Sequence, residues 1–366
     1  MRVLVVNAGS SSVKLSLLGP GDETLASQEL EALQAQVDPA ELGAALGAGG
    51  LGDADAVGHR IVHGGAQFRE PVRVDASVEA ALRGLVDLAP LHQPKSLAAL
   101  DAVSAALPGL PAVACFDTAF HSTLPAAAFT YALPAAWTSR WAVRRYGFHG
   151  LSHAWVAQRA PLVLGQSAPE VRIVSCHLGA GASLCAIAGG RSVDTTMGFT
   201  PLEGLVMATR SGSVDPGLLL WLLEREALTT AELGEALEHQ SGLLGLSGTP
   251  DMREVLDRAG SGDSGAGLAL EVYLHRLRAC IAAMTASLGG LDVLVFTGGV
   301  GERSAEIRGR AADGLRWLGV AVDAARNAGV SEDAEISAPG AAVRTVVVHA
   351  REDVEIARET RHVLGS

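Results

Sequence analysis

Arginine recurs beside glycine and histidine at three places in the chain, a pattern that favours binding of an anion. Arg60 lies in residues 59–65, two arginines open residues 144–150, and Arg210 lies in residues 209–212. A guanidinium suits phosphoryl and carboxylate oxygens because its planar fork donates two parallel hydrogen bonds and keeps its charge. Each arginine taken singly is more often a solvated charge. Their shared setting, in turns that contain Gly and His, predicts an anion clamp.

A carboxylate and an imidazole are the candidates for catalysis. Asp117 directly follows an apolar run, where a carboxylate is either a helix cap, which is the common case, or a catalytic group. His149, between an aromatic residue and a glycine, is the functional candidate among the histidines, whereas His63, His153 and His275 suit structural roles. The sequence has neither H-E-x-x-H nor Cys/His ligand spacing, and no G-x-S-x-G elbow. It therefore predicts neither a zinc site nor a serine hydrolase.

Two turns of matching layout lie 170 residues apart and indicate an internal duplication. Residues 3–14 and 173–183 each have the pattern of a strand, a small-residue turn and a second strand, with Gly9 falling on Gly179. Small residues allow backbone N–H groups to approach a bound anion closely. Lys14 lies just beyond the first turn, although small residues are also common in ordinary hairpins. Two such hairpins predict two similar lobes that grip a polyphosphate.

A third glycine-rich turn, residues 298–302, follows an apolar strand and would allow the backbone to approach a nucleotide closely. Its spacing is not G-x-G-x-x-G and it comes late in the chain, so a Rossmann dinucleotide site is not expected. The first turn is not a Walker A loop either, because it lacks the G-x-x-x-x-G-K spacing and joins two strands.

The elements that would position these residues alternate between strands and helices, which predicts the α/β class. The predicted strands cover residues 3–7, 13–18, 56–62, 113–116, 172–177, 183–187, 293–297 and 345–349. The predicted helices cover residues 78–88, 96–107, 152–159, 216–225, 268–288 and 354–364. The helix over 268–288 has the clearest apolar stripe and ends at a Gly-Gly pair. Residues 43–52 are expected to form a connection, and residues 124–141 to cross between the lobes.

The composition bounds the class of protein. With 366 residues, the chain is longer than a single core usually organises, so two lobes are expected. A net charge of −12 argues against nucleic acid or an anionic membrane as a partner. The apolar runs are too short for a signal peptide or a membrane span, and the four cysteines lack C-x-x-C spacing, which suits the reduced thiols of a cytosolic protein. Lys occurs only at positions 14 and 95 and Asn only at 7 and 327, so each is more informative than usual.

The chain closely resembles the acetate kinase family, which belongs to the acetate and sugar kinase, heat-shock and actin superfamily. Six segments carry the resemblance in family order over nearly the whole chain: residues 5–14, 58–65, 116–121, 145–150, 194–204 and 296–302. The resemblance implies a two-lobed, duplicated ribonuclease-H-like (actin-like ATPase) fold with the active site in the interlobe cleft. It implies an N-terminal lobe of residues 1–118 plus 353–366 for substrate and phosphate contacts. It also implies a C-terminal lobe of residues 119–352 for nucleotide binding and dimerisation, in a cytoplasmic homodimer.

The resemblance also implies roles for the residues that would handle the phosphoryl group. Asn7 and Glu352 would lie near Mg²⁺, with Mn²⁺ as an alternative ion. Arg60 would bind the substrate carboxylate, Asp117 matches the catalytic aspartate, and His149 and Arg210 match the stabilisers of the transition state. The small apolar pocket for the methyl group matches Val62, Leu91, Phe148 and Pro201.

The nucleotide, ATP or ADP, would be held by residues from several segments. The phosphates would lie near Lys14, with Ser10 and Ser12. The remaining matches are His177, Leu178, Gly179, Ala180, Gly181, Asp251, Met252, Arg253, Gly299, Val300, Gly301, Glu302 and Arg303. The chain departs from the family at Ala180, Arg303 and Gln93, where the family has Asn, and residues 247–250 form a shortened segment. Ala180 and Arg303 bear on nucleotide affinity and base preference, and not on the groups that act on the phosphoryl.

The expected activity is reversible, direct in-line phosphoryl transfer from ATP to acetate, giving acetyl phosphate and ADP. A carboxylate is already ionised at neutral pH, so the attack needs no strong general base. A propionate or butyrate kinase is the nearest alternative, because one methylene in an apolar pocket changes discrimination by only about 1–3 kcal/mol. A chaperone or actin-like assembly protein on the same core, and a non-catalytic nucleotide sensor, are the alternatives from other classes.

Overall fold

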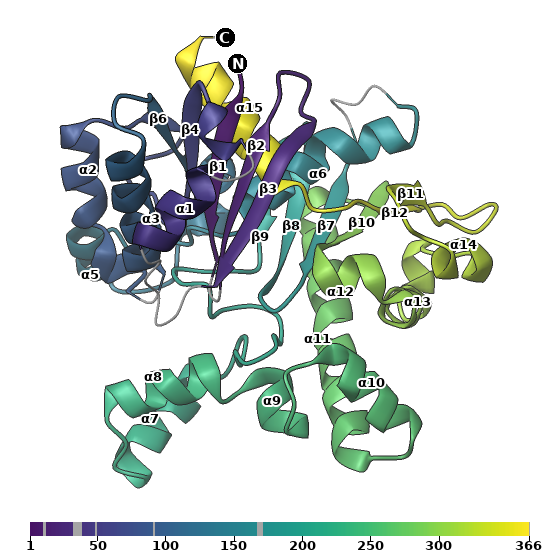
Figure 1. The fold of residues 1–366 in the computed structure, drawn as a ribbon. Helices are drawn as coiled ribbons and strands as arrows, with labels where there is room; N and C mark the ends of the chain where they lie inside the picture. The colour runs from purple at the N-terminus through teal and green to yellow at the C-terminus, as the bar shows by residue number, and fades with distance from the viewer. Residues whose placement is uncertain (10–11, 32–38, 48–49, 91, 167–170, 366) are drawn as a thin grey trace. The chain divides into compact units, whose positions relative to one another are not determined.

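The computed structural model describes residues 1–9, 12–31, 39–47, 50–90, 92–166 and 171–365. The chain forms two compact units. The first consists of Met1–Ser122, Phe148–Trp155 and Arg351–Ser366, and the second of Thr123–Gly147 and Val156–Ala350. Each unit is built on a mixed six-stranded sheet with helices, so the predicted α/β class is confirmed (Figure 1).

The first sheet has the strand order β3-β2-β1-β4-β6-β5. Its strands are β1 (Val3–Ala8), β2 (Ser12–Leu18), β3 (Thr24–Glu31), β4 (Ala56–Ile61), β5 (Val72–Arg73) and β6 (Ala112–Phe116). The second sheet has the order β9-β8-β7-β10-β12-β11 when it is read from its antiparallel end. Its strands are β7 (Ile173–Leu178), β8 (Ala182–Ala188), β9 (Arg191–Thr195), β10 (Val293–Thr297), β11 (Ala334–Glu335) and β12 (Arg344–Val347).

The two sheets match strand for strand. In each sheet the first three strands of the chain form an antiparallel meander, and the first of them also pairs in parallel with the fourth. The last strand of each unit pairs in parallel with that fourth strand and antiparallel with a two-residue edge strand. Each first hairpin turn begins at a glycine whose N–H bonds across the turn, Gly9 N to Ser12 O at 2.8 Å and Gly179 N to Gly181 O at 3.0 Å, although the first turn is one residue longer. The predicted duplication of a two-lobed fold is therefore confirmed.

The helices of the first unit are α1 (Pro39–Gly47), α2 (Ala76–Arg83), α3 (Gln93–Ala106) and α15 (Glu352–Leu364), with short 3₁₀ segments at Leu51–Asp53, Val86–Leu88 and Ala119–Thr123. α6 (Gly150–Val163) begins in the first unit and continues in the second. The second unit holds α4 (Ala126–Phe129), α5 (Ala135–Trp141), α7 (Pro216–Arg225), α8 (Thr230–His239), α9 (Gly242–Ser247), α10 (Met252–Gly260), α11 (Ser264–Leu288), α12 (Gly298–Arg303), α13 (Ala305–Asp313) and α14 (Ala324–Ala328), with a 3₁₀ turn at Arg316–Leu318.

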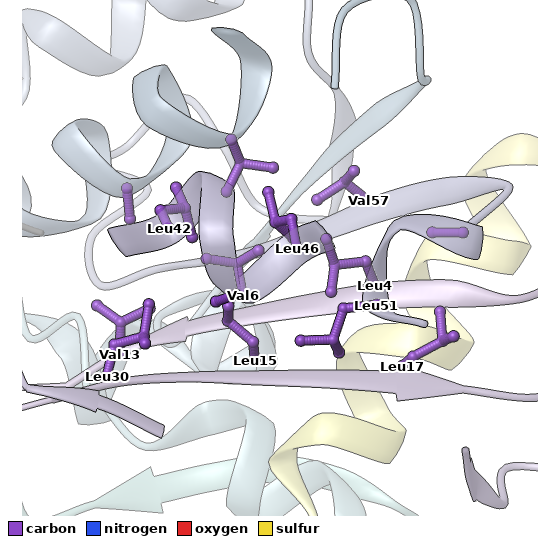
Figure 2. Packing of buried hydrophobic residues seen from close by; sticks show 14 of the residues in the cluster. Leu4, Val6, Val13, Leu15, Leu17, Leu30, Leu42, Leu46, Leu51 and Val57 are labelled. Atoms are coloured by element: carbon purple, nitrogen blue, oxygen red, sulfur yellow. The ribbon is translucent and has the colours of Figure 1, made fainter. Parts of the chain in front are cut away.

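One face of the first sheet carries an aliphatic core (Figure 2). Leu4 and Val6 of β1 pack with Leu15 of β2 and with Leu42 and Leu46 of α1. Alternate residues of a strand point to the same face, so Leu4 and Val6 both point towards the apolar side chains of α1. Burying each such side chain contributes about 1.5–3 kcal/mol to stability.

The opposite face of the first sheet is covered by α15, which contacts β1, β4 and β6 (Figure 1). The helix approaches so closely that a Cβ at Gly58 would lie 2.4 Å from Thr360 Oγ1 and 2.6 Å from Ile356 Cγ2. Only glycine permits this approach. The close packing fixes α15 against β4 and thereby fixes the helix N-terminus, where Glu352 is the first residue.

Several elements differ from the sequence-based expectations. The described part of residues 43–52 is not a simple connection, because it contains the end of α1, with Leu46 buried, and the start of a 3₁₀ turn, with Leu51 buried. Residues 124–141 contain two short helices, and the predicted helix over 78–88 divides at Gly84 into α2 and a 3₁₀ turn. α7 and β10 have the predicted ends. The four cysteines are free thiols, as expected.

The first unit also includes Phe148–Trp155, which the sequence-based division assigned to the second lobe. Backbone bonds explain the placement, since Gly150 N donates to Asp117 O at 2.8 Å. Within the described residues, no helix combines the length and apolarity needed to cross a bilayer.

Candidate active site

Arg60 lies at the centre of a polar cluster in the first unit. Its Nε and Nη2 donate to the two carboxylate oxygens of Asp117 at 2.9 and 2.7 Å. Its Nη1 donates to Asn7 Oδ1 at 2.9 Å and lies 3.8 Å from Glu352 Oε2. β1, β4 and β6 are parallel, so their carboxyl ends meet at one edge of the sheet and bring these side chains together. The N-terminus of α15 adds Glu352.

The cluster carries more negative than positive charge. The Arg60 side chain is 15% exposed and that of Asp117 is 2% exposed. Burial opposes the charge on Arg60, but the carboxylates of Asp117 and Glu352 outweigh it and raise the pKa of the guanidinium. Burial raises the pKa of Asp117, Arg60 opposes this rise, and Glu352 adds to it. One guanidinium therefore faces two carboxylates, and the remaining negative charge suits a bound cation.

The donor set fits Mg²⁺. Asn7 Nδ2 donates to Glu352 Oε2 at 2.9 Å, so the amide and the carboxylate lie side by side. Carboxylate and amide oxygens are hard ligands, and Mg²⁺ is usually held by one or two carboxylates together with waters and substrate phosphates. The described part of the chain has no group of three or more His, Cys, Asp or Glu side chains that would hold a metal by themselves. Mn²⁺ would use the same oxygens.

His149 has a strained backbone next to this cluster. Its φ of 56° is in the left-handed region, which costs a non-glycine residue about 1–3 kcal/mol and often marks a functional site. The strain is maintained from both sides, because His121 Nε2 lies 3.0 Å from Phe148 O and Gly150 N donates to Asp117 O. A Cβ at Gly150 would lie 2.2 Å from Asp117 O, so only glycine fits.

The other residues predicted for the first unit are placed as follows. Val62 and Phe148 are buried, and the Phe148 ring meets the His63 ring edge to face at 5.5 Å. Lys14 is exposed on β2 directly opposite Asn7 of β1. Ser12 Oγ donates to Glu29 Oε1 at 2.5 Å. Ser10 and Leu91 lie outside the described residues.

The second unit brings together three of its predicted segments around the turn that follows β7. On one side lies α12, because a Cβ at Gly298 would be 2.8 Å from Leu178 O, and Gly298 has a φ of 77° that suits glycine. On the other side, Ala208 N donates to Ala180 O at 3.1 Å, which joins the turn to the segment that carries Arg210. His177 to Gly181, Gly299 to Arg303 and Arg210 therefore belong to one region of this unit.

Arg210 is a partly buried cation whose charge is only weakly compensated by the described residues. Its side chain is 17% exposed, its Nη1 donates to the carbonyl of the buried Pro201 at 3.0 Å, and its Nε lies 3.5 Å from Glu238 Oε2. Burial lowers the pKa of Arg210, and Glu238 only partly offsets this effect. The arrangement suits an additional anionic partner.

Two groups of charged residues have structural roles that the sequence did not reveal. The Asp251 side chain accepts from Arg253 N at 2.9 Å as the N-cap of α10, and the Arg253 side chain is 88% exposed. The arginines of residues 144–150 bond to protein groups of the second unit. Arg145 binds Glu203 and the carbonyls of Thr196 and Met197, and Arg144 lies 3.9 Å from the centre of the Phe129 ring. These partners are more than 14 positions away in sequence, so spacing alone could not find them.

The comparisons with known proteins agree with this geometry. The model of the acetokinase family matches residues 47–358. The chain belongs to the acetokinase family. It is 51% identical to the acetate kinase of Gloeobacter violaceus, over 83% of this chain and 75% of that protein. It is 45% identical to the acetate kinase of Deinococcus radiodurans, over 100% of this chain and 98% of that one.

Solved structures of an acetate kinase and a propionate kinase share the fold of the chain. An acetate kinase of Porphyromonas gingivalis has a TM-score of 0.91 and 38% identity, with 99% of each chain covered. A propionate kinase of Francisella tularensis also has a TM-score of 0.91, with 35% identity and 99% of each chain covered. The predicted family and enzyme class, a kinase with a carboxyl group as acceptor, are confirmed.

Proposed function

We propose that the protein transfers the γ-phosphoryl group of ATP to acetate, giving acetyl phosphate and ADP, and catalyses the reverse reaction with the same groups. The observation that carries the proposal is the cluster of Arg60, Asp117, Asn7 and Glu352. It combines a positioned guanidinium with oxygen ligands that carry excess negative charge. Transfer between two anions requires alignment and charge neutralisation rather than a strong base.

The residues of the first unit have distinct roles in this proposal. Arg60 binds the acetate carboxylate with the two N–H groups that its three described bonds leave over, while Asp117 holds the guanidinium in a fixed plane. His149, held in its strained conformation, donates to the transferring phosphoryl. Val62 and Phe148 enclose the methyl group and exclude water. Mg²⁺ held by Asn7 and Glu352 would neutralise charge on the phosphates.

The second unit supplies the nucleotide contacts. Backbone N–H groups of Ala180 and Gly181 and of the first turn of α12 would hold ATP, and Arg210 would bind the developing charge on the γ-phosphoryl. Ala180 lacks the side-chain amide of the family, but the backbone donors of its turn remain. We also propose a cytoplasmic homodimer. The exposed Leu220 and Trp221 of α7, at 64% and 51%, support an interface that is buried on association.

A coupled assay of acetyl phosphate formation from acetate and ATP, run beside propionate and butyrate, tests the proposal. The expected result is the highest kcat/KM with acetate. A higher value with propionate would make the protein a propionate kinase, the activity named for the similar Francisella tularensis structure. ATP binding without transfer to any short-chain carboxylate would indicate a nucleotide sensor instead.

Arg210→Ala is expected to lower kcat by about 10²-fold with a small change in thermal stability. The reason is that the partners of Arg210 in the described residues are a carbonyl oxygen and a carboxylate 3.5 Å away, so its removal costs the folded state little. Steady-state kinetics and thermal unfolding measure both effects. Arg316→Ala, which removes a solvent-exposed charge from the same unit, is the matched control. Equal turnover in the two variants would exclude Arg210 from the reaction.

Val62→Ala is expected to shift preference from acetate towards propionate. The substitution removes two methyl groups from a buried side chain and makes room for about one more carbon, an effect of about 1–3 kcal/mol on discrimination. The ratio of kcat/KM for the two acids measures it. An unchanged ratio would show that Val62 does not line the acyl pocket.

A further inference from the structure

The side chain of Glu302 folds back onto its own segment rather than extending away from it. Its Oε1 accepts from Gly298 N at 2.9 Å and from Ala350 N at 2.9 Å. Gly298 is the first residue of α12, which carries the predicted nucleotide contacts. Ala350 is the last residue of the second unit, and the chain enters the first unit at Arg351. One carboxylate oxygen thus joins the nucleotide segment to the end of the second unit.

The nucleotide segment is fixed at its other end as well. Arg308 is 1% exposed and donates to Gly301 O at 2.9 Å and to Glu302 O at 2.6 Å. Asn327, one of only two asparagines in the chain, holds Arg308 by accepting from its Nε at 2.7 Å. The position of Glu302 is therefore set by buried bonds and follows any displacement of α12.

The two residues before Ala350 each donate a backbone hydrogen bond within the second unit. Val348 N donates to Phe296 O at 3.0 Å, and His349 N donates to Asp333 Oδ1 at 2.8 Å. Asp333 also accepts from Arg159 Nε of α6 at 2.6 Å, so within the second unit it bonds close to two of the four places where the chain passes between the units, the one after Trp155 and the one after Ala350. Ala350 N is the last of these anchored amides. Glu352, the proposed metal ligand, follows two residues later.

We propose that Glu302 is a positioning residue that couples the nucleotide segment to the chain carrying Glu352. Nucleotide that binds to Gly299–Arg303 changes the position or rigidity of α12, and the Glu302 carboxylate transmits the change to Ala350 N. The proposal rests on the proposed function for the identity of the ligand. It requires an acceptor oxygen at Oε1 and no negative charge, because both donors are neutral backbone amides.

Hydrogen exchange of the Ala350 amide, measured with and without Mg-ADP, tests the coupling. In the natural protein, Mg-ADP is expected to slow this exchange about tenfold, within the range of ordinary coupling between sites. Glu302→Gln keeps an acceptor oxygen and should retain the response, whereas Glu302→Ala should lose it and raise the KM for Mg²⁺ about tenfold. Thermal unfolding confirms that each variant is folded. Glu306→Ala, an exposed carboxylate four residues along, is the control that should leave exchange and activity unchanged.

Three results would overturn the coupling. The first is no change in Ala350 exchange when Mg-ADP is added to the natural protein. The second is a full response in Glu302→Ala. The third is a loss of response in Glu302→Gln equal to that in Glu302→Ala, because this would show that the negative charge of Glu302 is required. Failure of the proposed function is a separate result. A natural protein that phosphorylates no short-chain acid can still bind Mg-ADP, and the exchange experiment then tests the coupling alone.

Discussion

Arg60→Ala is expected to lower kcat for acetyl phosphate formation by about 10³-fold. The substitution removes the guanidinium proposed to bind acetate and also leaves the nearly buried Asp117 without its bidentate partner. Breaking a buried ion pair from one side is strongly destabilising, by about 3–5 kcal/mol, so the thermal stability should fall as well. Turnover and thermal unfolding must therefore be measured together.

Arg60→Lys separates the two effects. The ammonium group retains the countercharge for Asp117 and Glu352, but it cannot donate the parallel bonds of a planar fork. We expect a protein close to natural stability with turnover still reduced by about 10²-fold. Arg83→Ala removes an exposed arginine that pairs with Asp101 and is the matched control. Turnover of the lysine variant equal to that of the natural protein would show that charge alone, and not the fork, is what the reaction uses.

Much of the fold could be predicted from patterns among residues that are close in sequence. The hairpins at Gly9 and Gly179 were predictable because small turn residues stand between apolar strands, and their repetition implied the duplicated sheets. The apolar stripe of α11 and the Asp-Pro start of α7 are equally local signals. Such features depend on neighbours within a few residues, and a sequence shows those directly.

The helices α8, α9 and α10, which lie between α7 and α11, were the largest omission. α8 begins with a complete capping box in which Thr229 and Glu232 bond reciprocally, a signal that was visible in the sequence. α10 begins at Met252 and has Asp251, a predicted nucleotide-binding residue, as its N-cap, and the capping bonds show why an aspartate suits that position. A cap and a ligand contact use the same residue types, so spacing alone could not separate them.

The chemistry of the site depends on pairs that are distant in sequence. Arg60 and Asp117 are both motif residues, yet nothing in either motif shows that they bond each other 57 positions apart. Glu302 and Ala350 are 48 positions apart, and Ala350 takes part only through its backbone. Residue type predicts which groups can act, but the parallel order of the strands decides which of them meet.

The protein is expected to lose stability steeply between neutral and mildly acid pH, because three histidines are buried in their neutral form. Burial lowers the pKa of His59, His63 and His121 to about 4, compared with 6.5 for an ordinary histidine. A depressed folded-state pKa means that the unfolded chain binds the proton first. The stabilising effect is therefore complete above pH 6.5 and is lost as the pH falls towards 4. Each histidine is expected to remove about 2 kcal/mol of stability between about pH 7.5 and about pH 5.

His59 gives the sharpest test of this expectation. Neither of its ring nitrogens has a hydrogen-bond partner in the described residues, and it lies on the same face of β4 as the core residues Val57 and Ile61. His59→Leu should reduce the loss of unfolding free energy between about pH 7.5 and about pH 5 by about 2 kcal/mol, measured by urea unfolding at both pH values. His275→Leu removes an exposed imidazole and is the control. If the two variants show the same pH dependence of the unfolding free energy, protonation of His59 does not oppose folding.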